Sequence, residues 1–210
     1  MAWRLAHRGL AVLIVVFLIQ HFAIHLVALL GREQHMAALS AVQGIYRNAF
    51  VEPVLLAALA LQIVIGLRLI LARWHQADKG FWGWAQISSG LYIAVFAALH
   101  SIAALSARHV YAIDTNFYWP AGTLNTAPLY WFFAPYYVLA VMAVFTHLAA
   151  ALRFGWPASR RIRLLAGTLV VSGAGLGVAI TAAFAGAFYD ITLPPEYVEY
   201  YQGYVDQVTP

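Results

Sequence analysis

The chain has 210 residues, of which 63% are hydrophobic and only 10% are charged. An average soluble domain has roughly 25% charged residues, so this composition excludes an ordinary water-soluble fold. The formal net charge is +4, but no basic stripe with interleaved aromatic residues accompanies it, and we expect no nucleic-acid partner. Because the chain has no cysteine, it cannot itself hold a disulfide, an iron–sulfur cluster or a thiol-attached haem.

Five long apolar segments follow one another along the chain. Each is close to the roughly 20 residues that cross the hydrocarbon layer as an α-helix. We therefore predict an all-α integral membrane bundle of five transmembrane helices, whose short connections leave no room for a separate soluble domain. The predicted spans within the single domain 1–210 are about 10–30, 51–71, 87–106, 131–152 and 164–188, followed by a tail at 189–210.

Basic residues are distributed unevenly between the two sets of connections. Only Arg32, Arg47 and Arg108, of the 12 Lys and Arg residues, fall on the side opposite the N-terminus. Since positively charged loops face the cytoplasm, we predict a cytoplasmic N-terminus and a C-terminus outside. The first apolar segment is too long for a cleavable signal, so we expect a multi-pass protein of the bacterial inner (cytoplasmic) membrane that retains it.

The segments between the spans differ in character. A polar connection beginning at Arg32 is expected between the first two spans. Residues 109–130 are too polar to cross the membrane and too aromatic for a plain linker, so we expect them to pack over the outer mouth of the bundle. The tail, with five tyrosines, is predicted to be a docking or covering segment. Glycines in the last span allow close helix packing; they are Gly167, Gly173, Gly175, Gly177 and Gly186.

Four histidines lie at membrane depth, namely His21, His25, His100 and His147. Imidazole is costly there unless it is paired or coordinated, so each is a candidate functional residue. The first and third spans both run outward, which allows His21 and His100 to face each other. Because neutral imidazole is a good iron ligand, we predict that this pair binds haem iron. His25 is a weaker candidate ligand that could instead bond a haem propionate or a quinone.

The other histidines and the small residues admit simpler interpretations. His7 shares one helical face with His21 and His25. It lies at a membrane interface, however, as do His35, His75 and His109. We prefer a solvated or snorkelling side chain for these four. An intramembrane histidine can also serve only as a hydrogen bond between helices. On the third span, a stripe with small members could leave room for a flat ring; it comprises Gln86, Gly90, Ala97 and His100.

Several of these residues, in this order, resemble the five-helix, dihaem cytochrome b membrane subunit of succinate:quinone and fumarate:quinone oxidoreductases. The resemblance covers most of the first four spans, and it is carried by His7, Phe17–His21, Gln86–Gly90, His100 and His147. It implies that His21 and His100 ligate an outer haem b. It also implies that the second and fourth spans ligate an inner haem.

The second span departs from this pattern. The position that should be histidine is Gln62, and glutamine is a poor iron ligand beside imidazole. The inner haem is then five-coordinate through His147, held with an unusual sixth partner, or missing. We expect one bis-histidine haem and leave the second open. Glu52, at the start of this span, resembles an acidic residue placed near a quinone or its proton exit, although a first-turn acid favoured by the helix dipole explains it equally well.

The resemblance implies single-electron transfer between haem b and quinone or quinol. Succinate or fumarate chemistry would then belong to flavoprotein and iron–sulfur partner subunits on the cytoplasmic side, and this chain would contain no catalytic residue. A second interpretation is a stand-alone membrane cytochrome b that passes electrons between quinone and an outer acceptor. A third is a haem-free membrane anchor or transporter, with the histidines in hydrogen bonds or a proton relay.

Overall fold

The computed structural model describes residues 2–74 and 80–208 and is helical, without strands, over these residues. Five helices are long and apolar enough to cross a membrane, as the sequence predicts, so the chain is a multi-pass membrane protein. His75, Asp78 and Lys79 lie outside the described residues. The long helices are α1 Ala2–Val27, extended by the 3-10 turn η1 Ala28–Leu30, α3 Val51–Trp74, α4 Gly80–His109, α6 Leu129–Gly155 and α7 Arg160–Phe184.

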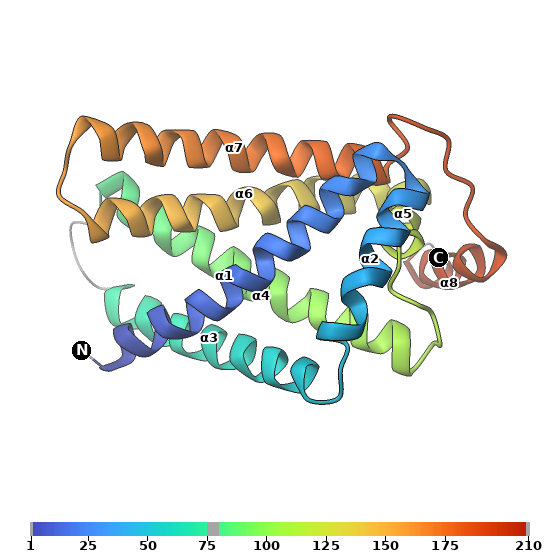
Figure 1. Cartoon of the computed structure of the whole chain (residues 1–210), viewed down its shortest axis with the longest axis horizontal. Helices are drawn as coiled ribbons and strands as arrows, with labels where there is room; N and C mark the ends of the chain where they lie inside the picture. The colour runs from blue at the N-terminus through green and yellow to red at the C-terminus, as the bar shows by residue number, and fades with distance from the viewer. Residues whose placement is uncertain (1, 75–79, 209–210) are drawn as a thin grey trace.

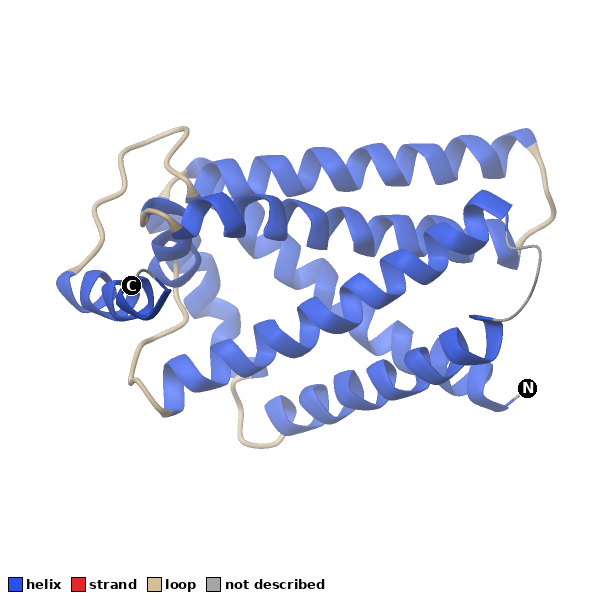
Figure 2. Ribbon diagram, turned by 180° about the vertical axis from the view of Figure 1, so that it is seen from behind, coloured by secondary structure: helices blue, strands red, loops and turns tan. Residues whose placement is uncertain are grey.

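The long helices alternate in direction between two ends of the bundle (Figure 1). One end carries the N-terminus and the α6–α7 connection, and we call it the N-terminal end. The other carries three shorter helices and is called the α8 end; these helices are α2 Arg32–Tyr46, α5 Tyr118–Asn125 and α8 Pro195–Val208. Seen from behind, the loops gather at these two ends (Figure 2). The apolar spans are thus free of irregular backbone, as a lipid environment requires.

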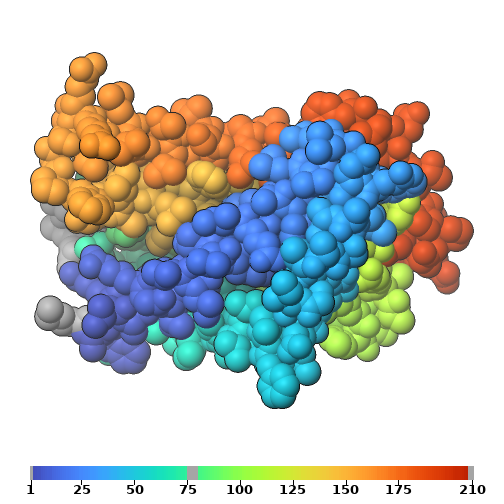
Figure 3. Space-filling view, viewed as in Figure 1, coloured from blue at the N-terminus to red at the C-terminus, as the bar shows by residue number. Residues whose placement is uncertain are grey.

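Helix α1 lies obliquely over the bundle and is separated from its centre by side chains. Over the described residues, its close backbone contacts are with α2, α3 and α7, whereas α4 and α6 pack closely against each other. In Figure 3 the surface is hollowed between the first turns of α1 and the last turns of α6, with α4 visible behind. Long side chains, and not backbone contacts, therefore bridge α1 to the layer formed by α4 and α6.

Helices α6 and α7 pack closely because glycines line their contact. A Cβ at Gly177 would stand 2.9 Å from the carbonyl oxygen of Val138, and a Cβ at Gly173 would collide with Phe145. The expectation of close packing is confirmed for these two positions. Gly175 and Gly167 face open space and have no such role. Close approach of backbones, which drives association in lipid, thus occurs along one face of α7.

The expected polar connection after α1 is in fact the helix α2, so that part of the prediction is wrong. Gly31 has φ +127°, a conformation that residues with a side chain rarely adopt, and it turns the chain from η1 into α2. Helix α2 is amphipathic, and it buries His35 and Leu39 against the rest of the bundle. Its polar first turn concealed this helix in the sequence.

A cap of aromatic residues covers the α8 end. Tyr197 and Tyr201 of α8 are each only 3% exposed, and they belong to one apolar cluster with Ile113. The ring of Tyr201 lies where Gly122 of α5 has no side chain, and its hydroxyl donates a hydrogen bond to the carbonyl of Trp119. The tail is therefore a covering segment that fastens the 109–130 region to this end.

The contrast between Gly177 and Gly175 is testable. Replacing Gly177 with Ala should lower the free energy of unfolding in detergent by about 1–3 kcal/mol, because the added methyl group overpacks against Val138. The melting temperature should fall accordingly. Gly175→Ala is the matched control and should be neutral or stabilising, since alanine favours the helix by about 1 kcal/mol. Equal melting temperatures for the two variants would contradict this packing.

Candidate functional site

Two clusters of histidines occupy the layer between α1 and the α4–α6 pair. The first, called the α8-side cluster, comprises His21, His25, His35 and His100. Within it, the rings of His21 on α1 and His100 on α4 have centroids 6.2 Å apart and planes inclined at 78°. These residues are 79 positions apart in the sequence, and the crossing of α1 over α4 (Figure 1) brings their two rings close together, edge towards face.

Aromatic side chains fix the orientation of both rings. Phe17 stacks on His21 at a centroid distance of 5.4 Å, and Phe96 stacks on His100 at 5.3 Å. Each phenylalanine precedes its histidine by four residues, so the two side chains share a helical face. The indole of Trp119, from α5 in the cap, meets His100 at 5.4 Å. One aromatic ring therefore packs against His21, and two pack against His100.

The α8-side cluster continues from His21 into α2. The ring of His25 lies 4.4 Å from that of His21, and its Nδ1 is 3.4 Å from Nε2 of His35. His35 is 1% exposed and packs against Phe117 and Phe184, so its interpretation as a solvated interfacial residue is wrong. Burial lowers the pKa of His35 to about 4, which keeps it neutral at pH 7.

The second cluster, called the N-terminal cluster, comprises His7, Gln62 and His147. The Nδ1 atom of His147 lies 3.2 Å from the carbonyl oxygen of Gln86 and 3.3 Å from the hydroxyl of Ser89. Gly90 permits this contact, because a Cβ there would stand 3.0 Å from Cε1 of His147. Gly90 thus makes room for His147 and not for His100, with which the sequence pattern had grouped it.

His7 faces His147 across the same layer. Their ring centroids are 6.4 Å apart and their planes are inclined at 56°. The Nε2 atoms of His7 and Gln62 are 3.2 Å apart, and Gly66 lies one turn further along α3, where a Cβ would come within 3.5 Å of His7. His7 is therefore half-buried and in contact with Gln62, and not simply solvated. His109, by contrast, is exposed, as expected.

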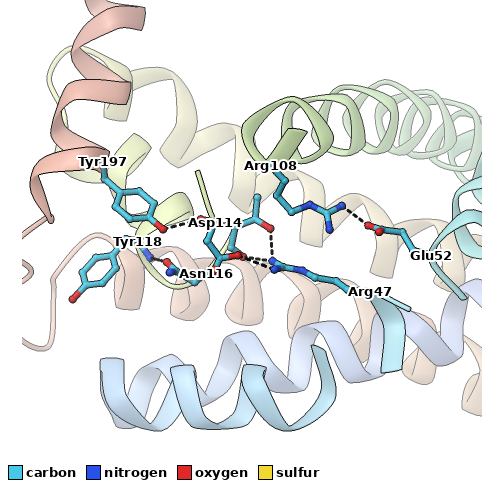
Figure 4. A network of polar contacts seen from close by, with 8 residues as sticks. Arg47, Glu52, Arg108, Asp114, Asn116, Tyr118 and Tyr197 are labelled. Carbon is cyan, nitrogen blue, oxygen red and sulfur yellow. Dashed lines mark hydrogen bonds and ion pairs between the residues drawn. The ribbon is translucent and has the colours of Figure 1, made fainter. Parts of the chain in front are cut away.

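Glu52 belongs to a different polar network, which joins helices at the α8 end (Figure 4). Its carboxylate pairs with the guanidinium of Arg108, a partner that the sequence did not suggest. Nearby, Arg47 pairs with Asp114 at 2.7 Å, and the backbone carbonyl of Asp114 accepts a hydrogen bond from Tyr197. These contacts tie α3 to α4 and the end of α2 to the cap, so Glu52 has a structural role.

The two imidazole pairs match the spacing that a single metal ion imposes. Metal–imidazole bonds are roughly 2.0–2.1 Å long, so two imidazoles on opposite sides of one ion have centroids roughly 6 Å apart. Within residues 2–74 and 80–208, no group of three or more His, Cys, Asp or Glu residues could hold a bare ion. Two facing imidazoles suit instead a metal whose other four ligands come from a planar macrocycle, as in haem.

Comparison with models of known protein families gives no match for this chain, and comparison with curated proteins also gives none. A functional proposal therefore has to rest on the geometry of the two clusters and on the sequence itself. Of the residues that sequence patterns left at the surface, His7 had one signal, its shared helical face with His21 and His25. His35 had none, because its burial depends on how α2 folds back.

Burial of neutral His35 predicts a loss of stability in acid. The unfolded chain binds a proton below the ordinary pKa of 6.5, while the folded chain does not until about pH 4, so stability falls as the pH drops between these values. At 1.4 kcal/mol per pH unit, about 2 kcal/mol should be lost between pH 6.5 and pH 5. Thermal unfolding of wild type and His35→Gln checks this. An equally steep pH dependence in the variant would contradict it.

Proposed function

We propose that this chain is a membrane b-type cytochrome that transfers electrons to or from quinone. The observation that carries the proposal is the facing pair His21 and His100, whose centroid separation of 6.2 Å is that of two imidazoles on one iron. Cofactor sites in helical bundles are built from inward side chains on facing helices. His21 on α1 and His100 on α4 are such inward side chains.

When bound, haem b supplies an iron that gains and loses single electrons. The residues of this chain would bind and orient it. His21 and His100 would hold the haem iron through a ring nitrogen of each, and the stacked Phe17 and Phe96 restrict rotation of the two imidazoles. The surrounding apolar helices exclude water and so influence the redox potential.

His25 and His35 provide polar groups beside this pair. Their hydrogen bond leads from the ring of His21 towards α2 at the α8 end. Quinone reduction needs protons as well as electrons, and imidazoles that donate and accept hydrogen bonds can orient a quinone carbonyl or pass a proton. Quinone is proposed as the redox partner on the resemblance of the sequence to quinone-linked cytochrome subunits.

The charge of the N-terminal end supports a proposal for orientation and partners. Arg160, Arg161 and Arg163 are exposed there, at the start of α7. By the positive-inside rule this end would face the cytoplasm of a bacterial inner membrane. A basic surface of this kind suits docking of flavoprotein and iron–sulfur subunits. We propose that these partners carry the succinate or fumarate chemistry, and that Glu52 acts on structure and not on quinone.

A stand-alone cytochrome b is the second candidate. The contact of Trp119 with His100 favours it, because this indole joins the proposed haem ligand to the cap at the α8 end. An electron acceptor could dock on that cap. Copurification with flavin and iron–sulfur subunits distinguishes the two functions, since only the first candidate requires them. A haem-free anchor or transporter would have no haem absorbance in a reduced-minus-oxidised spectrum.

Substitution of one axial ligand tests the proposal. His100→Ala should abolish the low-spin haem signal of the His21–His100 site, because only one of the two imidazoles that would hold the iron remains. His109→Ala is the matched control on the same helix and should keep the wild-type spectrum, since His109 is exposed. Haem content and visible spectra of the purified proteins provide the measurement. An unchanged spectrum of His100→Ala would overturn the ligand assignment.

A further inference from the structure

Side chains from three helices meet at the N-terminal end. Arg73 lies in the last turn of α3, Gln86 in the second turn of α4 and Arg153 in the last turn of α6. Arg73 donates a hydrogen bond from Nη1 to the side-chain oxygen of Gln86 at 2.9 Å. Its guanidinium carbon also stands 5.7 Å from the ring of Phe154, the residue that follows Arg153. Two arginines from different helices therefore share one small region of the bundle.

Arg153 has an incomplete set of partners. Its guanidinium carbon lies 5.7 Å from the ring of Trp82 on α4, in a cation–π contact. Its Nε and Nη1 atoms are buried and have no hydrogen-bond partner among the described residues. A guanidinium has several N–H donors, and a donor without a partner is costly in surroundings of low dielectric constant. The described part of the chain thus leaves this cation without an acceptor.

Within residues 2–74 and 80–208, no acidic side chain lies at the N-terminal end. The chain has eight Asp and Glu residues, of which Asp78 lies outside the described ranges. The other seven lie at the α8 end, in α2, in α8, in the first turn of α3 or in the connections of that end. Positive charges that share one region repel each other, and a low dielectric constant strengthens the repulsion. Binding of an anion between the two arginines is favoured for the same reason.

Exposed aromatic side chains indicate the depth of this region in the membrane. Trp74, which follows Arg73, is 47% exposed, and Trp84 of α4 is 51% exposed. Phe154, which follows Arg153, is also 51% exposed. Tryptophan is enriched where a membrane protein passes through the lipid headgroups. The two arginines therefore lie at the depth of the lipid phosphates.

The region opens to the surface of the bundle. Arg73 and Arg153 are half-buried and not enclosed. The last turns of α6, which carry Arg153, border the hollow that Figure 3 shows between α6 and the first turns of α1. A headgroup can therefore approach from the membrane surface, and the long stem of Arg153 lets its guanidinium turn towards it.

We propose that Arg73 and Arg153 bind the phosphate of a phospholipid whose headgroup has a net negative charge. Guanidinium groups match phosphate oxygens in bidentate geometry, and basic pockets between transmembrane helices bind such headgroups. Gln86 fixes Arg73 and Trp82 holds Arg153, so both cations are positioned before the lipid binds. The bound lipid links the ends of α3, α4 and α6. The proposal does not depend on haem or quinone.

Lipid binding to the full-length protein in neutral detergent tests this proposal. Native mass spectrometry should show tighter binding of phosphatidylglycerol than of phosphatidylcholine, whose headgroup has no net charge. Arg153→Gln should weaken the binding of phosphatidylglycerol at least about tenfold, because charge-assisted hydrogen bonds to the phosphate are lost. Arg4→Gln is the matched control, since it removes an exposed arginine from the same end, and it should change the affinity less than about twofold. Equal affinities for the two lipids, or equal effects of the two substitutions, would overturn the proposal.

Melting temperatures separate lipid binding from a purely structural role of Arg153. In detergent without lipid, Arg153→Gln should be at least as stable as the wild type, because it removes a cation that lacks an acceptor. With phosphatidylglycerol, the wild type should melt at the higher temperature. A variant that is less stable by the same amount with and without lipid would mean that Arg153 only packs against Trp82, and the lipid site would be refuted.

Two further measurements identify the source of the phosphate. Arg153→Lys should regain part of the affinity for phosphatidylglycerol, because lysine keeps the charge and loses the bidentate geometry. Inorganic phosphate should stabilise the wild type less than phosphatidylglycerol does, since it has no acyl chains to hold it in the membrane. Equal stabilisation by inorganic phosphate would indicate a site for a free anion. Phosphatidylglycerol binding that depends on neither arginine would leave the pair to an acidic partner protein, and either result would overturn the assignment to lipid.

Discussion

An imidazole within the hydrocarbon layer needs a partner for its ring nitrogens, because no water is available there to satisfy them. In this chain the path of α1 decides which partners its imidazoles meet. The helix stands away from α4 and α6, and its histidines meet those helices through side chains. The wide layer between the helices would be unstable if it were lined only by small apolar residues, since packing provides most of the association energy in lipid. In the proposed function, a ligand shared by the imidazoles of this layer would remove this difficulty.

The rest of the bundle holds this layer in place. Glycines of α7 let it pack closely on α6, the helix that carries His147, and the stacked phenylalanines of α1 and α4 hold His21 and His100. At the α8 end, α2 folds back so that His35 reaches His25, and the aromatic cap brings Trp119 against His100. Elements that look peripheral in the sequence thus contribute directly to the surroundings of the α8-side cluster.

Much of the fold follows from composition and periodicity. Five apolar segments of membrane-spanning length predict the five long helices, and the pair His21 and His100 follows from the parallel direction of two of them. The helix α2 could not be recognised, because its polar first turn resembles a loop until Gly31 reverses the chain. The partners of Glu52, Gly90 and Gln62 depend on the rotation of each helix about its axis. A sequence pattern predicts on which face of a helix a residue lies. It does not predict which neighbouring helix that face contacts.

The position of iron in the purified protein tests the central claim most directly. In a crystal structure with anomalous diffraction data at the iron edge, we expect a peak between the rings of His21 and His100, roughly 2.0–2.1 Å from one nitrogen of each. The account predicts a planar density around that peak, in the layer between α1 and α4. The two rings in direct contact with each other or with water, without an iron peak between them, would contradict it.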